Sequence, residues 1–159
     1  MAEAGIATTP DPERARSVVV GLDLAMTYDT IRRAADAITH GAAFIATNTD
    51  ATYPVPGGVW PGAGSLVAAI ETASGVTPLV VGKPHEPIRA LIRGRVGSGP
   101  VVVVGDRPET DLALAADTSW RTVLVLTGVT DDPSGVRPVP SAVLASLSEL
   151  PDYLNGENR

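Results

Sequence analysis

The order in which apolar runs and helical segments follow one another constrains the fold of this chain most. Five short runs of β-branched and aliphatic residues are spaced along it, at 18–20, 42–46, 78–81, 101–104 and 121–126. The segments between them carry apolar residues at helical spacing, as Ile31, Ala34, Ala35 and Ile38 do. Parallel strands need long crossover connections, which are usually helices. The pattern therefore predicts an α/β fold with a parallel sheet and helical crossovers.

Capping and turn residues predict where these elements end. Thr27 is expected to cap a helix that stops at Gly41. Segment 53–64 is rich in proline and glycine and is predicted to form turns, with Ser65 as a candidate cap of the next helix. Segment 108–117 is predicted to be helical, and 141–154 to hold a last short strand and a helix.

Composition excludes several kinds of protein. The net charge of -6 argues against a surface for nucleic acid or anionic membranes. The chain has no cysteine, which excludes disulfides, thiolate zinc sites and cysteine nucleophiles and is typical of a cytoplasmic protein. No apolar run approaches the roughly 18 residues of a membrane span, and segment 1–17 lacks the apolar core of a secretory signal.

Polar groups follow three of the expected strands. Lys83 comes after 78–81, Asp106 after 101–104, and the loop after 42–46 contains Asn48 and Asp50. In open parallel sheets, ligands bind beyond the carboxyl ends of the strands. A second acid, Asp111, follows Asp106 by five positions. Paired carboxylates suit Mg²⁺, which prefers oxygen ligands, and a lysine suits phosphate oxygens.

Simpler interpretations exist for each of these residues alone. A lone Gly-Asp after a strand is more often a turn or a helix cap. The "TGV" at 127–129 also follows a strand and is expected to be a turn more than part of a site. Lys83 and Asp106 together, in this order and 23 positions apart, are much more specific.

The longer motifs resemble one known family. "GKPHEP" followed by "VVVVGDRPETD" is similar to motifs III and IV of the haloacid dehalogenase-like phosphatases. "VVVGLDLAMTYDTI", "AFIATNTDATYPV" and "PGAGSLVAAIETASG" resemble the branch with phosphoglycolate, pyridoxal-phosphate, nitrophenyl-phosphate and glycerol-3-phosphate phosphatases, subfamily IIA. The resemblance extends over nearly the whole chain, from about residue 1 to 154.

The resemblance implies roles for individual residues. Lys83 matches the catalytic lysine that holds nucleophile and phosphate together, and Asp106 and Asp111 match the acids that bind Mg²⁺ or orient its water. Residues 1–79 match the C-terminal portion of an α/β cap domain, in which Asn48 and Asp50 lie in a polar loop on the substrate side. Residues 80–159 match the second half of the Rossmann-like core. The implied substrate is a small phosphorylated metabolite.

The motif that carries the family's nucleophile is absent. That nucleophile is an aspartate in a D-x-D motif, and no D-x-D occurs in these 159 residues. The chain therefore resembles the C-terminal part of a longer protein, beginning inside the cap. An alternative makes Asp23 the nucleophile and Thr47 the motif II residue of a complete, capless enzyme. Ala25 then replaces the general acid/base, whose loss costs roughly 10²- to 10⁴-fold, so Asp23 is interpreted as a turn or helix-entry acid.

Two functions follow from this. The first is a magnesium-dependent phosphoric monoester hydrolase whose isolated C-terminal part turns over little or no substrate. The alternative is a non-catalytic pseudo-enzyme or assembly module that pairs with a missing N-terminal half, because an exposed sheet edge invites pairing. Such an edge also allows a homodimer. A response-regulator-like or nucleotide-binding domain is disfavoured, since "GLDLAMT" is not a glycine-rich phosphate loop.

Overall fold

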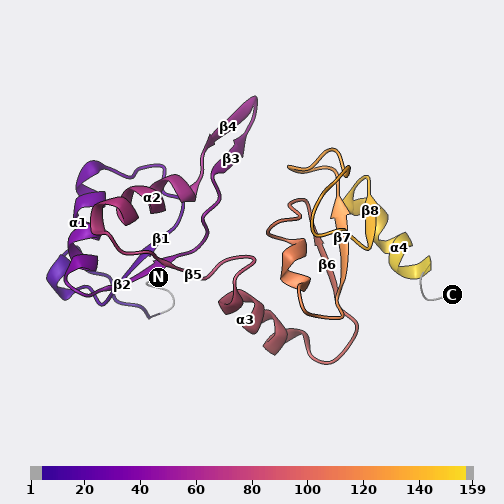
Figure 1. The fold of residues 1–159 in the computed structure, drawn as a ribbon, viewed down its shortest axis with the longest axis horizontal. Coiled ribbons are helices and arrows are strands. Elements are labelled where there is room, and N and C mark those ends of the chain that lie inside the picture. Colours follow the sequence, from indigo (N-terminus) through magenta and orange to yellow (C-terminus); the bar gives the residue numbers. More distant parts are fainter. Residues whose placement is uncertain (1–4, 157–159) are drawn as a thin grey trace. The chain divides into compact units, whose positions relative to one another are not determined.

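The chain folds into two units, which meet in sequence between Gly82 and Lys83. The computed structural model describes residues 5–156 (Figure 1). The sequence places the division three residues earlier, between the predicted cap portion at 1–79 and the predicted core portion at 80–159.

The first unit is built on a parallel sheet with helical crossovers. Its strands lie in the order β1 (Ser17–Val20), β2 (Ala43–Ala46) and β5 (Leu79–Val80). Helix α1 (Tyr28–Thr39) connects β1 to β2, and helix α2 (Ala63–Ser74) precedes β5 (Figure 1). A short 3₁₀ helix, η2 (Pro12–Arg14), precedes β1. This confirms the α/β fold that the alternating pattern predicts.

One face of this sheet is packed and the other is open. Alternate residues of a strand point to opposite faces. Val20 and Phe44 point toward α1 and α2 and are buried with Ile38, Val67 and Ile70. On the opposite face, Val19 remains 41% exposed and Leu79 58% exposed. The helices therefore cover a single side of the sheet among the residues described.

Helix α1 begins and ends where the sequence predicts. The Thr27 side chain accepts a hydrogen bond from the Thr30 amide, as an N-cap residue does. The Nδ1 atom of His40, the C-cap residue, lies 2.8 Å from the Asp36 carbonyl oxygen and 3.3 Å from Asp36 Oδ1. This contact with the backbone carbonyl, and then the Asp36 charge, raises the pKa of His40 above its usual 6.5.

We expect the first unit to lose a small part of its stability as the pH rises past this value. A raised pKa in the folded state means that the contribution is fully present below pH 6.5 and disappears as His40 deprotonates at its raised pKa. His40→Gln should remove this dependence, measured as the urea midpoint of the first unit at several pH values. His85→Gln, in the second unit, is the control. An unchanged pH profile in His40→Gln would contradict the assignment.

The structure of segment 53–64 differs most from what the sequence predicts. The structure forms a β-hairpin there instead of turns alone, with β3 (Thr52–Val55) paired to β4 (Gly58–Pro61). Pro56 and Gly57 make the connection, and the φ of +85° at Gly57 suits the third position of a type II turn. The predicted cap at Ser65 is also wrong, because α2 begins at Ala63 after Gly62.

The second unit contains a separate parallel sheet. Its order is β6 (Val102–Gly105), β7 (Arg121–Val125) and β8 (Ala142–Leu144), with Val123 and Leu124 fully buried in the central strand. Helix α3 (Glu86–Val96) precedes β6, and 3₁₀ helix η4 (Leu147–Glu149) and helix α4 (Leu150–Gly156) follow β8. The helix predicted at 108–117 is only a 3₁₀ turn, η3 (Leu112–Ala115). No helix in the part of the chain that the structure describes is long and apolar enough to cross a bilayer.

Candidate active site

Lys83 and Asp111 form an ion pair in the second unit. Lys83 precedes α3, and Asp111 is the residue before η3. The Lys83 Nζ atom lies 2.5 Å from Asp111 Oδ1. The Asp111 side chain is only 10% exposed, whereas that of Lys83 is 52% exposed. The lysine side chain is therefore half exposed, while its partner is anchored inside the unit.

Asp111 is fixed from its other side by the backbone after β6. Its Oδ2 atom accepts hydrogen bonds from the amides of Asp106 (3.2 Å) and Arg107 (3.1 Å). The Asp111 amide in turn donates to the Arg107 carbonyl at 2.7 Å. A Cβ atom at Gly105 would overlap the Asp111 side chain, so only glycine allows this approach. Both carboxylate oxygens of Asp111 are thus engaged within the protein.

Asp106 directly follows the carboxyl end of β6, and a different loop, the one after β7, orients its side chain. Its Oδ2 atom accepts a hydrogen bond of 2.7 Å from the Val129 amide, and its carbonyl accepts one from the Thr130 amide. A Cβ atom at Gly128 would overlap Asp106 Oδ2. The expected turn at 127–129 therefore also positions Asp106. The sequence signal was Gly128, three residues after the end of strand β7. Asp106 Oδ1 has no hydrogen-bond or ion-pair partner among residues 5–156.

The carboxylates suit a divalent cation by their chemistry. Mg²⁺ is usually held by one or two carboxylates together with water and substrate phosphate oxygens. Asp106 offers Oδ1, and Asp111 contributes negative charge close by. No group of three histidine, aspartate or glutamate side chains within the described residues is arranged to hold a metal ion. Of the carboxylate oxygens of Asp106 and Asp111, only Asp106 Oδ1 therefore has no partner among the described residues and is free to accept a cation.

A second contact joins the region of α3 to the region of η3, and the sequence does not predict it. Arg89 of α3 is 17% exposed, and its Nη2 atom donates to the carbonyl of Ala116, directly after η3. Its guanidinium also lies 3.8 Å from Asp117. Arg89 thus ties α3 to the end of η3, while Lys83 ties the start of the same region to Asp111. Contacts at this separation leave no local signal in a sequence.

The remaining predicted site residues lie in the first unit. Asn48 Nδ2 donates to Asp50 Oδ2 at 2.7 Å, so the two side chains order their own loop. Glycines 62, 64 and 82 pack against the backbone of this loop without room for a Cβ atom. Asp23 Oδ1 accepts from the Ala25 amide and Asp23 O from the Met26 amide, which is the geometry of a turn. The structure brings Lys83, Asp106 and Asp111 together in one unit and leaves Asn48, Asp50 and Asp23 in the other.

Comparison with known proteins identifies relatives of both units. Residues 80–150 match the family described as HAD-hydrolase-like. Dihydroxyacetone phosphatase from Corynebacterium glutamicum is 36% identical over 152 residues, covering 92% of this chain and 54% of that protein. D-glycerol 3-phosphate phosphatase from Mycobacterium tuberculosis is 39% identical over 147 residues, covering 92% of this chain and 40% of that protein.

Solved structures that resemble this chain include phosphatases of the same kind. A hypothetical protein from Pyrococcus horikoshii matches with a TM-score of 0.82 and 41% identity, covering 96% of this chain and 57% of that one. Glycerol phosphate phosphatase from Mycobacterium tuberculosis, in complex with magnesium, matches with a TM-score of 0.81 and 36% identity, covering 94% and 47%. The chain spans about half the length of the proteins it matches. These matches confirm the family that the motifs predict: the chain is a relative of the haloacid dehalogenase-like phosphatases of subfamily IIA.

Proposed function

We propose that this chain is the C-terminal part of a magnesium-dependent phosphatase that hydrolyses monoesters of small phosphorylated metabolites. The observation that carries the proposal is the cluster of Lys83, Asp106 and Asp111 at the carboxyl end of β6. The three residues come from two motifs of one family and meet in the structure with one free carboxylate oxygen and one half-exposed lysine side chain.

In this proposal Mg²⁺ would be held by Asp106, whose Oδ1 atom has no partner among the described residues, with Asp111 as the neighbouring acid. The ion would neutralise phosphate charge and orient the phosphoryl group. Asp111 acts mainly by holding Lys83 and the Asp106 amide in place, because both of its oxygens are engaged. Lys83 would bind a phosphate oxygen through its exposed side, where charge develops during transfer.

The nucleophile would come from a segment that this chain does not contain. In the proposed reaction an aspartate attacks phosphorus, the alcohol leaves, and water hydrolyses the aspartyl-phosphate. The first unit would be part of the cap, with Asn48 and Asp50 on its substrate side. The names of the relatives, dihydroxyacetone phosphatase and glycerol 3-phosphate phosphatase, support a small phosphorylated polyol or ketose as the substrate class. The charge and lack of cysteine support a cytoplasmic protein that does not bind nucleic acid.

A specific observation also favours the non-catalytic alternative, an assembly module. β6 is an edge strand of its sheet among the described residues. The Val101 carbonyl accepts from the Arg121 amide, so Val102 and Val104 direct their backbone groups away from β7. An apolar edge with unpaired backbone groups invites a further strand. A parallel strand added at this edge would end beside Asp106. If that strand carried the nucleophile, the same edge would complete the catalytic site of the first proposal.

The test is hydrolysis of p-nitrophenyl phosphate with Mg²⁺. We expect little or no turnover by the pure chain, and activity when it is combined with the unmatched half of the corynebacterial relative. Asp106→Asn and Lys83→Met should then each lower kcat by at least about 10²-fold, the scale of removing one charge-stabilising group. Asp132→Asn is the control, because its carboxylate only accepts from the Ser134 amide in an exposed loop.

Two results would contradict this proposal. Robust magnesium-dependent turnover by the pure chain would place a nucleophile within it, and loss of that activity in Asp23→Asn would identify the residue. A stable complex of the two halves without hydrolysis would instead favour the assembly module. Binding of Mg²⁺ that is weaker in Asp106→Asn, followed by NMR shifts of the Val129 amide, checks the metal site independently of turnover.

A further inference from the structure

Arg89 carries a largely enclosed charge in the second unit that is only partly paired. Its side chain is 17% exposed, and its Nε atom is buried without a hydrogen-bond partner among the described residues. The Glu86 and Asp117 carboxylates lie 3.9 Å and 3.8 Å from the guanidinium, which is too far for hydrogen bonds. The guanidinium donates instead to the Ala116 carbonyl. Since enclosing a charge is costly, this contact is a poor source of stability and is better understood as a constraint on conformation.

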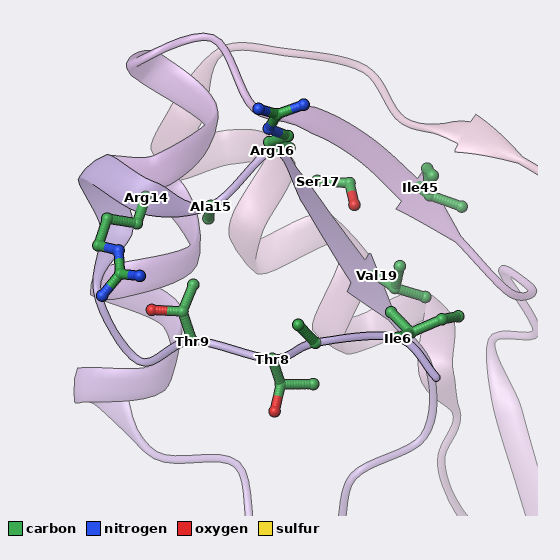
Figure 2. A pocket seen from close by; sticks show the side chains of 10 residues that line it. Ile6, Thr8, Thr9, Arg14, Ala15, Arg16, Ser17, Val19 and Ile45 are labelled. Carbon is green, nitrogen blue, oxygen red and sulfur yellow. The ribbon is translucent and has the colours of Figure 1, made fainter. Parts of the chain in front are cut away.

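The arginines near the start of the first unit are placed differently. Figure 2 shows Arg14 and Arg16 among the side chains that line an open pocket of about 820 Å³. Both residues are exposed, so water can solvate their charges. Arg89 differs, because its guanidinium is largely enclosed and contacts a carbonyl 27 residues farther along the chain.

The Ala116 carbonyl belongs to a strained turn. The Thr118 amide donates to the Ala115 carbonyl at 3.1 Å, which closes a β-turn over Ala116 and Asp117. The backbone angles are φ -55° and ψ 137° at Ala116 and φ +59° at Asp117, as in a type II turn. The second central position of such a turn favours glycine, and Asp117 is the one non-glycine residue within 5–156 that has a positive φ. The turn therefore has a form that its own sequence disfavours.

The contact with Arg89 explains why this turn does not relax. Types I and II differ by a flip of the central peptide, here the one between Ala116 and Asp117, and type I would give Asp117 a negative φ. The flip would also turn the Ala116 carbonyl away from Arg89, which would leave the enclosed guanidinium without its hydrogen bond. An enclosed charged donor without a partner is costly, whereas aspartate tolerates a positive φ better than most residues. Arg89 therefore favours the type II form.

Two contacts thus join the segment that contains Lys83 to the segment that contains Asp111. Lys83 pairs with Asp111 at the start of the two segments, and Arg89 bonds to Ala116 farther along both. One contact alone would let the segments pivot about it, whereas two contacts fix their orientation. No residue of α3 is fully buried, so apolar packing within the described part of the chain contributes little to holding this helix.

We propose that Arg89 is a positioning residue for Lys83, and that it acts by holding the type II turn after η3. With the turn held, α3 and η3 keep one orientation and the Lys83 ammonium stays on Asp111. Arg89 acts through this loop, because its hydrogen bond goes to the backbone after η3. The contact itself does not depend on any activity, while its effect on turnover rests on the proposed function.

NMR of the chain alone tests the turn. In a type II turn the Ala116 Hα proton lies close to the Asp117 amide proton and gives a strong NOE, whereas in type I the two amide protons approach each other. We expect the type II pattern in the parent chain and the type I pattern in Arg89→Met, which keeps an apolar stem. Arg93→Met is the control, because Arg93 bonds to Glu86 within the same helix. An unchanged turn in Arg89→Met, or a changed one in Arg93→Met, would overturn the proposal.

A rescue variant separates positioning from general stability. Glycine adopts a positive φ without strain, so Arg89→Met/Asp117→Gly should regain the type II turn without the guanidinium. The Asp106 and Arg107 amides, which donate to Asp111, report on the site. Their hydrogen exchange should become about tenfold faster in Arg89→Met, relative to amides of β7, and slow again in the double variant. A double variant that exchanges as fast as Arg89→Met would show that the turn does not position Asp111, and the proposal would fail.

Turnover provides the readout at Lys83 itself. In the chain combined with the unmatched half of the corynebacterial relative, Arg89→Met should lower kcat by about tenfold or more with little change in KM. Misplacing a group that acts in the transition state by ~1 Å can cost about 10²-fold. Adding Asp117→Gly should restore most of kcat, and an equal kcat in the parent and Arg89→Met would contradict the positioning of Lys83. If the combined parent is itself inactive, the proposed function fails, while the NOE and exchange results still decide the role of Arg89.

Discussion

Asp111→Ala is expected to lower the free energy of unfolding of the second unit by about 2 to 5 kcal/mol. The change removes the acceptor of two backbone amides, those of Asp106 and Arg107, in a place that is nearly closed to water. A buried donor left without a partner costs about 1 to 3 kcal/mol. The lost ion pair to Lys83 adds little, because that side chain is half exposed and screened by solvent.

Urea denaturation measures this effect. Trp120 is half-buried in the second unit, so a Trp60→Phe background makes tryptophan fluorescence report on that unit alone. Asp111→Asn is the matched variant, since its amide oxygen can still accept from the two backbone amides. We expect it to lose only about 1 kcal/mol, the net value of weakening such bonds. If Asp111→Ala and Asp111→Asn are equally stable, the backbone contacts are not what holds this loop.

Gly82→Ala is expected to have the second large effect, a loss of stability of the first unit. A Cβ atom at residue 82 would overlap the carbonyl oxygen of Thr47. That carbonyl cannot turn aside easily, because the Thr47 amide donates to Val20 and the Val81 amide donates to Ala46 on either side of it. We expect a loss of about 3 kcal/mol, the upper part of the range for forcing atoms into packed space.

Gly94→Ala is the control for replacing a glycine as such. Gly94 lies inside α3, and a Cβ atom there meets nothing within 4 Å. Alanine should stabilise that helix by about 0.5 to 1 kcal/mol. Urea denaturation followed by NMR signals of each unit measures both changes. A Gly82→Ala variant with unchanged stability would show that the loop of Asn48 and Asp50 yields without cost.

The sequence predicts the strands well because their side chains are buried on a sheet. Runs of β-branched residues mark β1, β6 and β7, and the capping threonine marks the start of α1. The sequence does not predict the hairpin of β3 and β4, because nearly all its strand residues are exposed and each strand contains a proline, so neither alternation nor propensity marks it. Segment 108–117 has helical composition, but the Asp111 carboxylate folds back onto the amides after β6 and a single 3₁₀ turn follows.

The sequence selects the three candidate residues but not the contacts that hold them in place. Motif spacing selects Lys83, Asp106 and Asp111, and the structure brings these three together. The Val129 amide and the Arg89 guanidinium hold the same loops over separations of 23 and 27 residues. Those contacts follow from how strands and helices pack, which no local pattern encodes.

Lys83 is the only lysine in the sequence. Its side chain is half exposed and its ammonium touches the buried carboxylate of Asp111. Amine-directed chemistry on this protein therefore has a single side-chain target besides the amino terminus. Reductive methylation with ¹³C-formaldehyde would place one isotopic reporter on that nitrogen. Its resonance would read out the electrostatic state of the loop directly, without a mutation and without any turnover.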